Sequence, residues 1–84
     1  MATWMELNEE EGGPRYYVNG VPMHAGDGLE VKLSGKWIAG HYEYSWPGRG
    51  YPLKPLFYYY YGDAEAVHLL DPMRDHVRLP GEGS

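Results

Sequence analysis

Glycine and proline interrupt this sequence so often that almost no segment is long enough for a stable helix. The 84 residues include 12 glycines and 7 prolines, and few stretches between them reach the roughly 10–12 residues that a helix needs. The remaining short segments alternate apolar with polar residues, which is typical of strands. We therefore expect one all-β, mainly antiparallel domain over residues 1–80, built from five to seven short strands, with 81–84 as a frayed tail.

The clearest pattern is a hairpin in the middle of the chain. Residues 29–33 alternate, so that Leu29, Val31 and Leu33 share one face and are expected to point inward. Ser34-Gly35 forms a two-residue turn. Residues 36–46 then form the longest strand, in which Gly40 indicates a bulge or a bend.

A second hairpin is expected near the N-terminus. Residues 3–8 alternate and place Thr3, Met5 and Leu7 on one face. Residues 9–14 are interpreted as a charged turn or loop. Residues 15–19 form the next strand, and Asn19-Gly20 predicts a type I′ turn at its end.

The C-terminal half has one ambiguous segment, residues 63–70. Asp63 is a suitable N-cap for a short helix, but the same residues also fit a strand paired with the tyrosine run before them. We favour the strand. The other elements expected here are a loop over 47–55, a strand over 56–61, a turn or single 3₁₀ turn over 71–75, and a closing strand over 76–79.

Strands this short do not stand alone, so we expect an antiparallel sheet curled on itself. Curling also removes the exposed edges that a tyrosine-rich strand would otherwise offer to other chains. The prediction is a small, partly open, SH3-like barrel.

A Gly-Asp pair, a hairpin and a Trp-x-x-Gly motif follow one another in the middle of the chain. The residues are His24-x-Gly26-Asp27-x-Leu29-Glu30-Val31, Ser34-Gly35-Lys36-Trp37 and Gly40-x-Tyr42-Glu43, and Val77-x-Leu79 ends the pattern. Over roughly residues 16–79, this pattern resembles the small bacterial family of unknown function DUF5348. It is also similar to SH3-like and Tudor-type barrels generally. The resemblance implies a fold but no catalytic residue, because the family carries no established chemistry. The stretch 47–55 and the tyrosine run depart from the pattern.

No motif indicates catalysis. The sequence has no Gly-x-Ser-x-Gly, no phosphate-binding Gly-Lys-Ser/Thr, no His-Glu-x-x-His and no cysteine. Its serines, Ser34, Ser45 and Ser84, lie at turn or strand ends or at the terminus. We expect a protein that is not an enzyme and that carries no cofactor.

Metal binding is also not expected. The four histidines lack the short spacings of metal-binding pairs, although His68 and His76 could face each other near Asp71 or Asp75. Asp27 lies between two glycines, but one aspartate is too few for calcium. A turn aspartate that bonds nearby backbone explains it better.

Basic and aromatic residues are concentrated in one block, residues 31–62. The block carries a net charge of +3, whereas the rest of the chain sums to −8, and it holds ten of the thirteen aromatic residues. Tyrosine and tryptophan are enriched at the energetically important positions of protein interfaces, and exposed aromatic patches often mark protein contacts. The candidate binding face is Trp37, Tyr42, Tyr44, Trp46, Tyr51, Tyr59 and Tyr61, and the candidate phosphate contacts are Lys32, Lys36, Arg49 and Lys54.

Three functions follow from these features. The favoured one is a cytoplasmic binding module that engages a protein partner, or its own copy, through the aromatic face, without contact with a membrane. The second is a nucleic-acid accessory protein, in which bases stack on aromatic rings and cations follow the phosphates. The third is a small acidic inhibitor of mobile-element or phage type that acts through Glu6, Glu9, Glu10 and Glu11.

Overall fold

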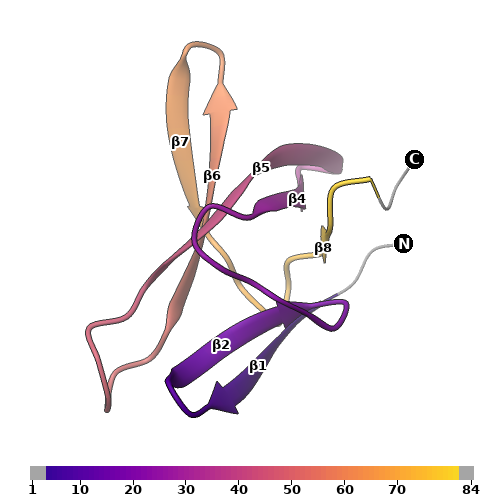
Figure 1. Ribbon diagram of the computed structural model, residues 1–84. Helices are drawn as coiled ribbons and strands as arrows, with labels where there is room; N and C mark the ends of the chain where they lie inside the picture. Colours follow the sequence, from indigo (N-terminus) through magenta and orange to yellow (C-terminus); the bar gives the residue numbers. More distant parts are fainter. Residues whose placement is uncertain (1–3, 82–84) are drawn as a thin grey trace.

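The computed structural model describes residues 4–81 and contains eight strands in that range (Figure 1). The strands are β1 (Met5–Glu10), β2 (Gly13–Val18), β3 (Val21–Pro22), β4 (Gly28–Leu33), β5 (Lys36–Ser45), β6 (Lys54–Tyr61), β7 (Ala64–Leu69) and β8 (Val77–Arg78). All pairings are antiparallel. The expected all-β antiparallel fold is confirmed.

The strands form two sheets, with the order β1-β2-β3 in one and β7-β6-β5-β4-β8 in the other. The two sheets are not closed into a barrel. Within residues 4–81, no helix has the length and apolarity needed to cross a membrane. The expected tail, 81–84, lies outside the described residues except for Gly81.

Two turns follow the sequence expectation closely. Asn19 and Gly20 have φ angles of 50° and 77°, and Ser34 and Gly35 have 51° and 79°. Positive φ at both central residues is the signature of a type I′ turn, whose twist matches that of the flanking strands. These two pairs therefore set the β2–β3 and β4–β5 registers.

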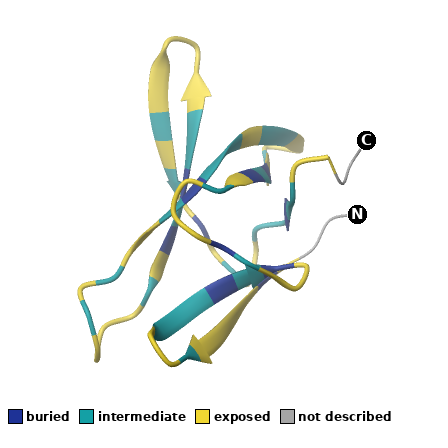
Figure 2. Ribbon diagram, in the orientation of Figure 1, coloured by how far each residue is buried: buried dark blue, intermediate teal, exposed yellow. Residues whose placement is uncertain are grey.

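The core lies between the two sheets, and both contribute to it (Figure 2). Its buried members are Met5, Tyr16, Val18, Met23, Leu29, Val31, Tyr42, Phe57, Leu70 and Val77. Leu29 and Val31 are fully buried as expected, and Leu33 packs against the core. Met5 is buried but Leu7, on the same face of β1, is 49% exposed, so β1 extends beyond the core after Met5.

The first hairpin is longer than expected. A charged turn or loop is expected over residues 9–14, but β1 continues to Glu10 and β2 begins at Gly13, so that only Glu11 and Gly12 form the turn. Similarly, the loop expected over 47–55 ends at Leu53, because Lys54 and Pro55 begin β6. β2 and β6 are therefore longer than the sequence predicts.

β5 changes partner halfway along its length. It pairs with β4 from Lys36 to His41 and with β6 from His41 to Ser45. The β4–β5 register is unbroken through Gly40, so Gly40 is not a bulge. Instead it allows close packing: a Cβ at this position would lie 2.2 Å from the carbonyl oxygen of Tyr58.

The segment after the tyrosine run is a strand, as favoured, and the helical alternative is wrong. β7 pairs with β6 from Leu56↔Leu69 to Tyr61↔Ala64. Beyond Tyr58, β6 has no pairing with β5, so the end of the β6–β7 hairpin is a two-stranded ribbon. Figure 1 shows it projecting from the molecule, and Figure 2 shows that its tip is exposed. Both Tyr60 and Tyr61 are therefore exposed, at 73% and 78%.

The turn before β8 is held by two aspartates. The amide of Met73 donates to Asp71 Oδ1 at 2.9 Å, and the amide of Asp71 donates to Asp75 Oδ2 at 2.8 Å. Asp75 Oδ2 also lies 2.9 Å from His68 Nε2. These bonds confirm a tight turn over 71–75 and tie it to β7.

Candidate functional site

A cleft opens between the β1–β2 hairpin and the loop of residues 46–53; we call it the aromatic cleft. It consists of an inner recess of about 100 Å³ and a wider outer part of about 330 Å³. The inner recess is lined by Glu10, Gly12, Gly13, Pro14, Arg15, Met23, Tyr42, Tyr44, Trp46 and Leu53. The outer part is lined by Glu9, Glu10, Glu11, Gly13, Pro14, Trp46, Arg49, Gly50 and Tyr51.

Trp46 forms the wall shared by the two parts. Its Nε1 donates to the carbonyl oxygen of Tyr51 at 3.1 Å, which fixes the ring to its own loop. The ring also lies against Gly13, where a Cβ would stand 2.6 Å from Trp46 Cη2. Gly13 has a φ of 124°, a conformation that is essentially restricted to glycine. Gly13 thus lets the indole pack directly on the backbone of β2.

The opposite wall contains a hydrogen-bonded carboxylate, Glu10. Arg15 Nε donates to Glu10 Oε1 at 3.1 Å, and the Tyr17 hydroxyl donates to Glu10 Oε2. The Tyr17 bond and then Arg15 hold the pKa of Glu10 below its ordinary value, and the same bond raises the pKa of Tyr17. Arg15 Nη1 also donates to the carbonyl oxygen of Met23 at 2.8 Å. This network fixes the wall and keeps Glu10 ionised.

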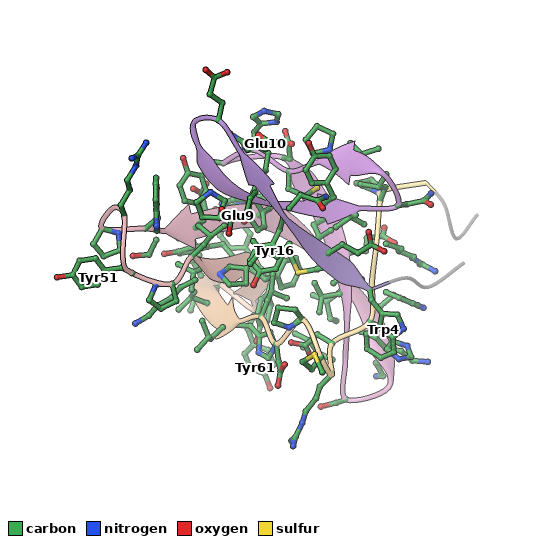
Figure 3. All side chains as sticks on the ribbon, turned by 90° about the horizontal axis from the view of Figure 1, so that it is seen from below. Trp4, Glu9, Glu10, Tyr16, Tyr51 and Tyr61 are labelled. Atoms are coloured by element: carbon green, nitrogen blue, oxygen red, sulfur yellow. The ribbon has the colours of Figure 1, made fainter. Side chains whose placement is uncertain are left out.

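The rim of the cleft carries charged side chains that are exposed and can contact a ligand. Glu9 and Glu11 are exposed, and within residues 4–81 no ion pair or side-chain hydrogen bond holds their carboxylates. Arg49, also exposed, lies on the loop side. Figure 3 shows Glu9 and Glu10 on the β1–β2 hairpin and Tyr51 on the neighbouring loop, with its hydroxyl pointing away from the molecule.

The structure brings only part of the predicted binding face together. Tyr44, Trp46 and Tyr51 line the aromatic cleft, and Tyr44 and Tyr51 are 44% and 63% exposed. Tyr42 was wrongly placed on an exposed face. It is 1% exposed and belongs to the core, where burial raises the pKa of its hydroxyl.

The other three predicted residues lie elsewhere. Trp37 packs under the guanidinium of Arg78, whose Cζ is 4.2 Å from the ring centroid. Tyr59 stacks on Phe57, with ring centroids 5.5 Å apart, and packs against the core. Tyr61 is at the tip of the β6–β7 hairpin, and Figure 3 shows it well apart from Tyr51. The seven residues therefore do not form one continuous face.

The four candidate phosphate contacts are also divided. Lys32 and Lys36 flank the β4–β5 turn, whereas Arg49 and Lys54 are near the far end of β5. A ten-residue strand has a length of about 30 Å. Arg49 also lines the cleft together with three glutamates. These cations do not form a single basic track.

No metal centre is found among residues 4–81, where no cluster of three histidine, aspartate or glutamate side chains could hold an ion. His68 bonds to Asp75, whereas His76 packs edge-on against Trp4 with ring centroids 4.2 Å apart. Asp27 Oδ2 accepts the amide of His24 at 2.9 Å. The interpretation of Asp27 as a turn aspartate is confirmed.

Sequence reasoning named Glu9, Glu10 and Glu11 as an acidic surface but missed that they face the aromatic residues, and it missed Gly13 and Arg15 as residues of the cleft wall. Their only visible signal was the Glu9–Pro14 stretch, which was assigned to a loop. Comparisons with protein-family models, with curated proteins and with solved structures find no match to this chain. The resemblance to DUF5348 therefore stays a prediction.

Proposed function

We propose that this protein is a non-enzymatic binding module whose aromatic cleft receives an extended, basic segment of a partner protein. The supporting observation is the composition of the two walls. Tyr44, Trp46 and Tyr51 lie on one side, and on the other lie the carboxylates of Glu9 and Glu11, which have no partner among residues 4–81.

This combination suits an arginine or lysine side chain. Aromatic faces attract cations, and an arginine or lysine stem can pack along a ring while its charge approaches a carboxylate. Tyrosine and tryptophan also contribute strongly to protein interfaces. The fixed Glu10–Arg15–Tyr17 network and the Trp46–Gly13 contact hold the cleft in shape before a ligand binds, which lowers the entropic cost of binding.

The charge arrangement favours a protein partner over nucleic acid. A phosphate backbone approaching Arg49 would also meet Glu9 and Glu11. The inhibitor hypothesis likewise expects a basic partner, but it requires only the glutamates. The two protein hypotheses therefore differ in whether the aromatic wall contributes to affinity.

A peptide titration followed by NMR tests the proposal. The probes are two capped hexapeptides in which glycine alternates with arginine or with glutamate. The indole N–H signal of Trp46 reports on the cleft, because that group donates to Tyr51. We expect the arginine peptide to shift this signal and the glutamate peptide to leave it unchanged.

Matched variants localise the contact. Tyr51→Ala removes part of the aromatic wall, whereas Tyr61→Ala removes a tyrosine at the β6–β7 tip that is even more exposed, at 78% against 63%. We expect only Tyr51→Ala, and separately Glu9→Gln with Glu11→Gln, to weaken arginine-peptide binding. Absence of a Trp46 shift at millimolar peptide, or equal losses in both tyrosine variants, would contradict the proposal. Tighter, salt-sensitive binding of oligothymidylate would favour the nucleic-acid alternative.

A further inference from the structure

The four strands at the sheet edges differ in how they are protected from pairing with other chains. β3 and β8 have two residues each, and β3 ends in Pro22. β1 carries Glu6, Glu9 and Glu10. Shortness, proline and charge are the usual devices that prevent edge pairing. β7 has six residues, contains no proline and only a single acidic residue, Glu65, and exposes Val67 and Leu69.

The register shows which backbone groups of β7 are open. The amide of Leu70 donates to the carbonyl oxygen of Pro55 at 3.0 Å. Backbone groups alternate in direction along an antiparallel strand, so even-numbered residues of β7 bond to β6 and odd-numbered residues face outward. Glu65, Val67 and Leu69 therefore direct their N–H and C=O groups away from the sheet.

The same residues carry exposed apolar side chains. Val67 is 55% exposed and Leu69 is 61% exposed. Alternation places them on one face of the hairpin together with Tyr60, which is the cross-strand neighbour of Glu65. The open backbone edge is thus bordered by an apolar surface. Figure 1 shows that this ribbon and the 46–53 loop project in different directions, so this surface is separate from the aromatic cleft.

We propose that β7 pairs antiparallel with β7 of a second copy of this chain, with Val67 at the two-fold axis. In this register, Val67 faces Val67 of the second copy and each Glu65 faces Leu69 of the other copy. All three outward-facing residues then pair, giving six backbone hydrogen bonds and no glutamate opposite a glutamate. Centring the pairing on Glu65 would place like charges opposite each other, and centring it on Leu69 would leave Glu65 outside the strand overlap.

The size of this contact predicts a weak dimer. One strand ladder and two aliphatic residues per chain form an interface smaller than the roughly 1,200–2,000 Å² of stable complexes. We therefore expect reversible association that increases with protein concentration.

Sedimentation velocity from low micromolar to millimolar concentration tests the association. We expect a dimer fraction that rises with concentration and is lost in Val67→Lys, which places two ammonium groups on the axis. The control is Val21→Lys, which changes another exposed valine on the protected edge β3; we expect it to leave the dimer intact. Circular dichroism confirms that both variants fold.

The register has its own test, because the chain contains no cysteine. Facing residues of a bonded pair have Cα atoms about 5.5 Å apart, within the range that a disulfide spans. We expect Val67→Cys to cross-link with itself on mild oxidation, and Glu65→Cys to cross-link with Leu69→Cys but not with itself. A strict monomer at millimolar concentration, a dimer unaffected by Val67→Lys, or self-linking of Glu65→Cys as fast as Val67→Cys would overturn the proposal. None of these outcomes depends on peptide binding by the aromatic cleft.

Discussion

Gly13 and Trp46 are in direct contact across 33 residues of sequence: a Cβ on Gly13 would stand 2.6 Å from Cη2 of the indole. The contact joins the three-stranded sheet to the loop that follows β5. It therefore sets the width of the aromatic cleft.

Gly13→Ala should displace Trp46 and destabilise the fold. Alanine at a φ of 124° costs about 1–3 kcal/mol, and its methyl group would overlap the indole. We expect a lower urea midpoint and a shifted Trp46 indole N–H signal, measured by denaturation and NMR. Gly12→Ala is the matched control, because a Cβ there meets nothing within 4 Å. Equal behaviour of the two variants would show that the contact is unimportant.

Gly40→Ala should destabilise the fold without affecting the cleft directly. Its methyl group would lie 2.2 Å from the carbonyl oxygen of Tyr58 and 2.8 Å from the ring of Phe57, which is fully buried. Overpacking a core commonly costs about 1–3 kcal/mol. We expect a fall of at least this size in the free energy of unfolding, measured in urea. A wild-type midpoint in this variant would mean that β5 and β6 separate easily at this point.

Glu10→Gln should remove a pH-dependent part of the stability. The pKa of Glu10 is lowered by the Tyr17 hydroxyl and Arg15, so its contribution is present above the unfolded-state pKa. That contribution is lost as pH falls through the folded-state pKa. We expect wild type to exceed Glu10→Gln in urea midpoint at pH 7 and the difference to shrink towards pH 3.

The control for this experiment is Glu11→Gln on the same hairpin. No side-chain partner holds Glu11 within the described range, so its substitution should leave the pH profile unchanged. A Glu10→Gln difference that stays constant from pH 7 to pH 3 would count against the network. The Tyr17 hydroxyl gives the opposite pH dependence, because its pKa is raised. Its contribution to the free energy of unfolding is present below the unfolded-state pKa and is lost as pH rises through the folded-state pKa.

Local features of the fold could be predicted from the sequence, because they depend on neighbouring residues. Asn19-Gly20 and Ser34-Gly35 select type I′ turns by themselves, and alternation along β4 identifies the buried face. Where each sheet ends is a non-local property. The strand over 56–61 was predictable, but its sequence could not reveal that β5 stops pairing with β6 after Tyr58.

The aromatic residues of the candidate site could be predicted from the sequence, but its acidic wall could not. Tyr44, Trp46 and Tyr51 were identified because aromatic residues cluster in the sequence around them. Tyr42 lies in the same aromatic-rich stretch and shares β5 with Tyr44, yet it packs in the core, as does its register partner Phe57. The acidic wall could not be assigned to the site, since its approach to the 46–53 loop depends on how two separate sheets pack.

The two ladders of β5 overlap in the middle of the strand. His41 lies opposite both Gly28 and Tyr58, and Tyr42 lies opposite Phe57 while its backbone bonds to Gly26 and Asp27. The five-stranded sheet therefore has two arms that share only the middle of β5, with β4 paired to its first half and the β6–β7 hairpin paired to its second half. Local opening of the β6–β7 unit does not require the β4–β5 ladder to break. Amide hydrogen exchange should accordingly proceed in two steps, first in residues 59–66 and much later in 29–33. The tip of the β6–β7 hairpin can then open while the rest of the fold stays folded.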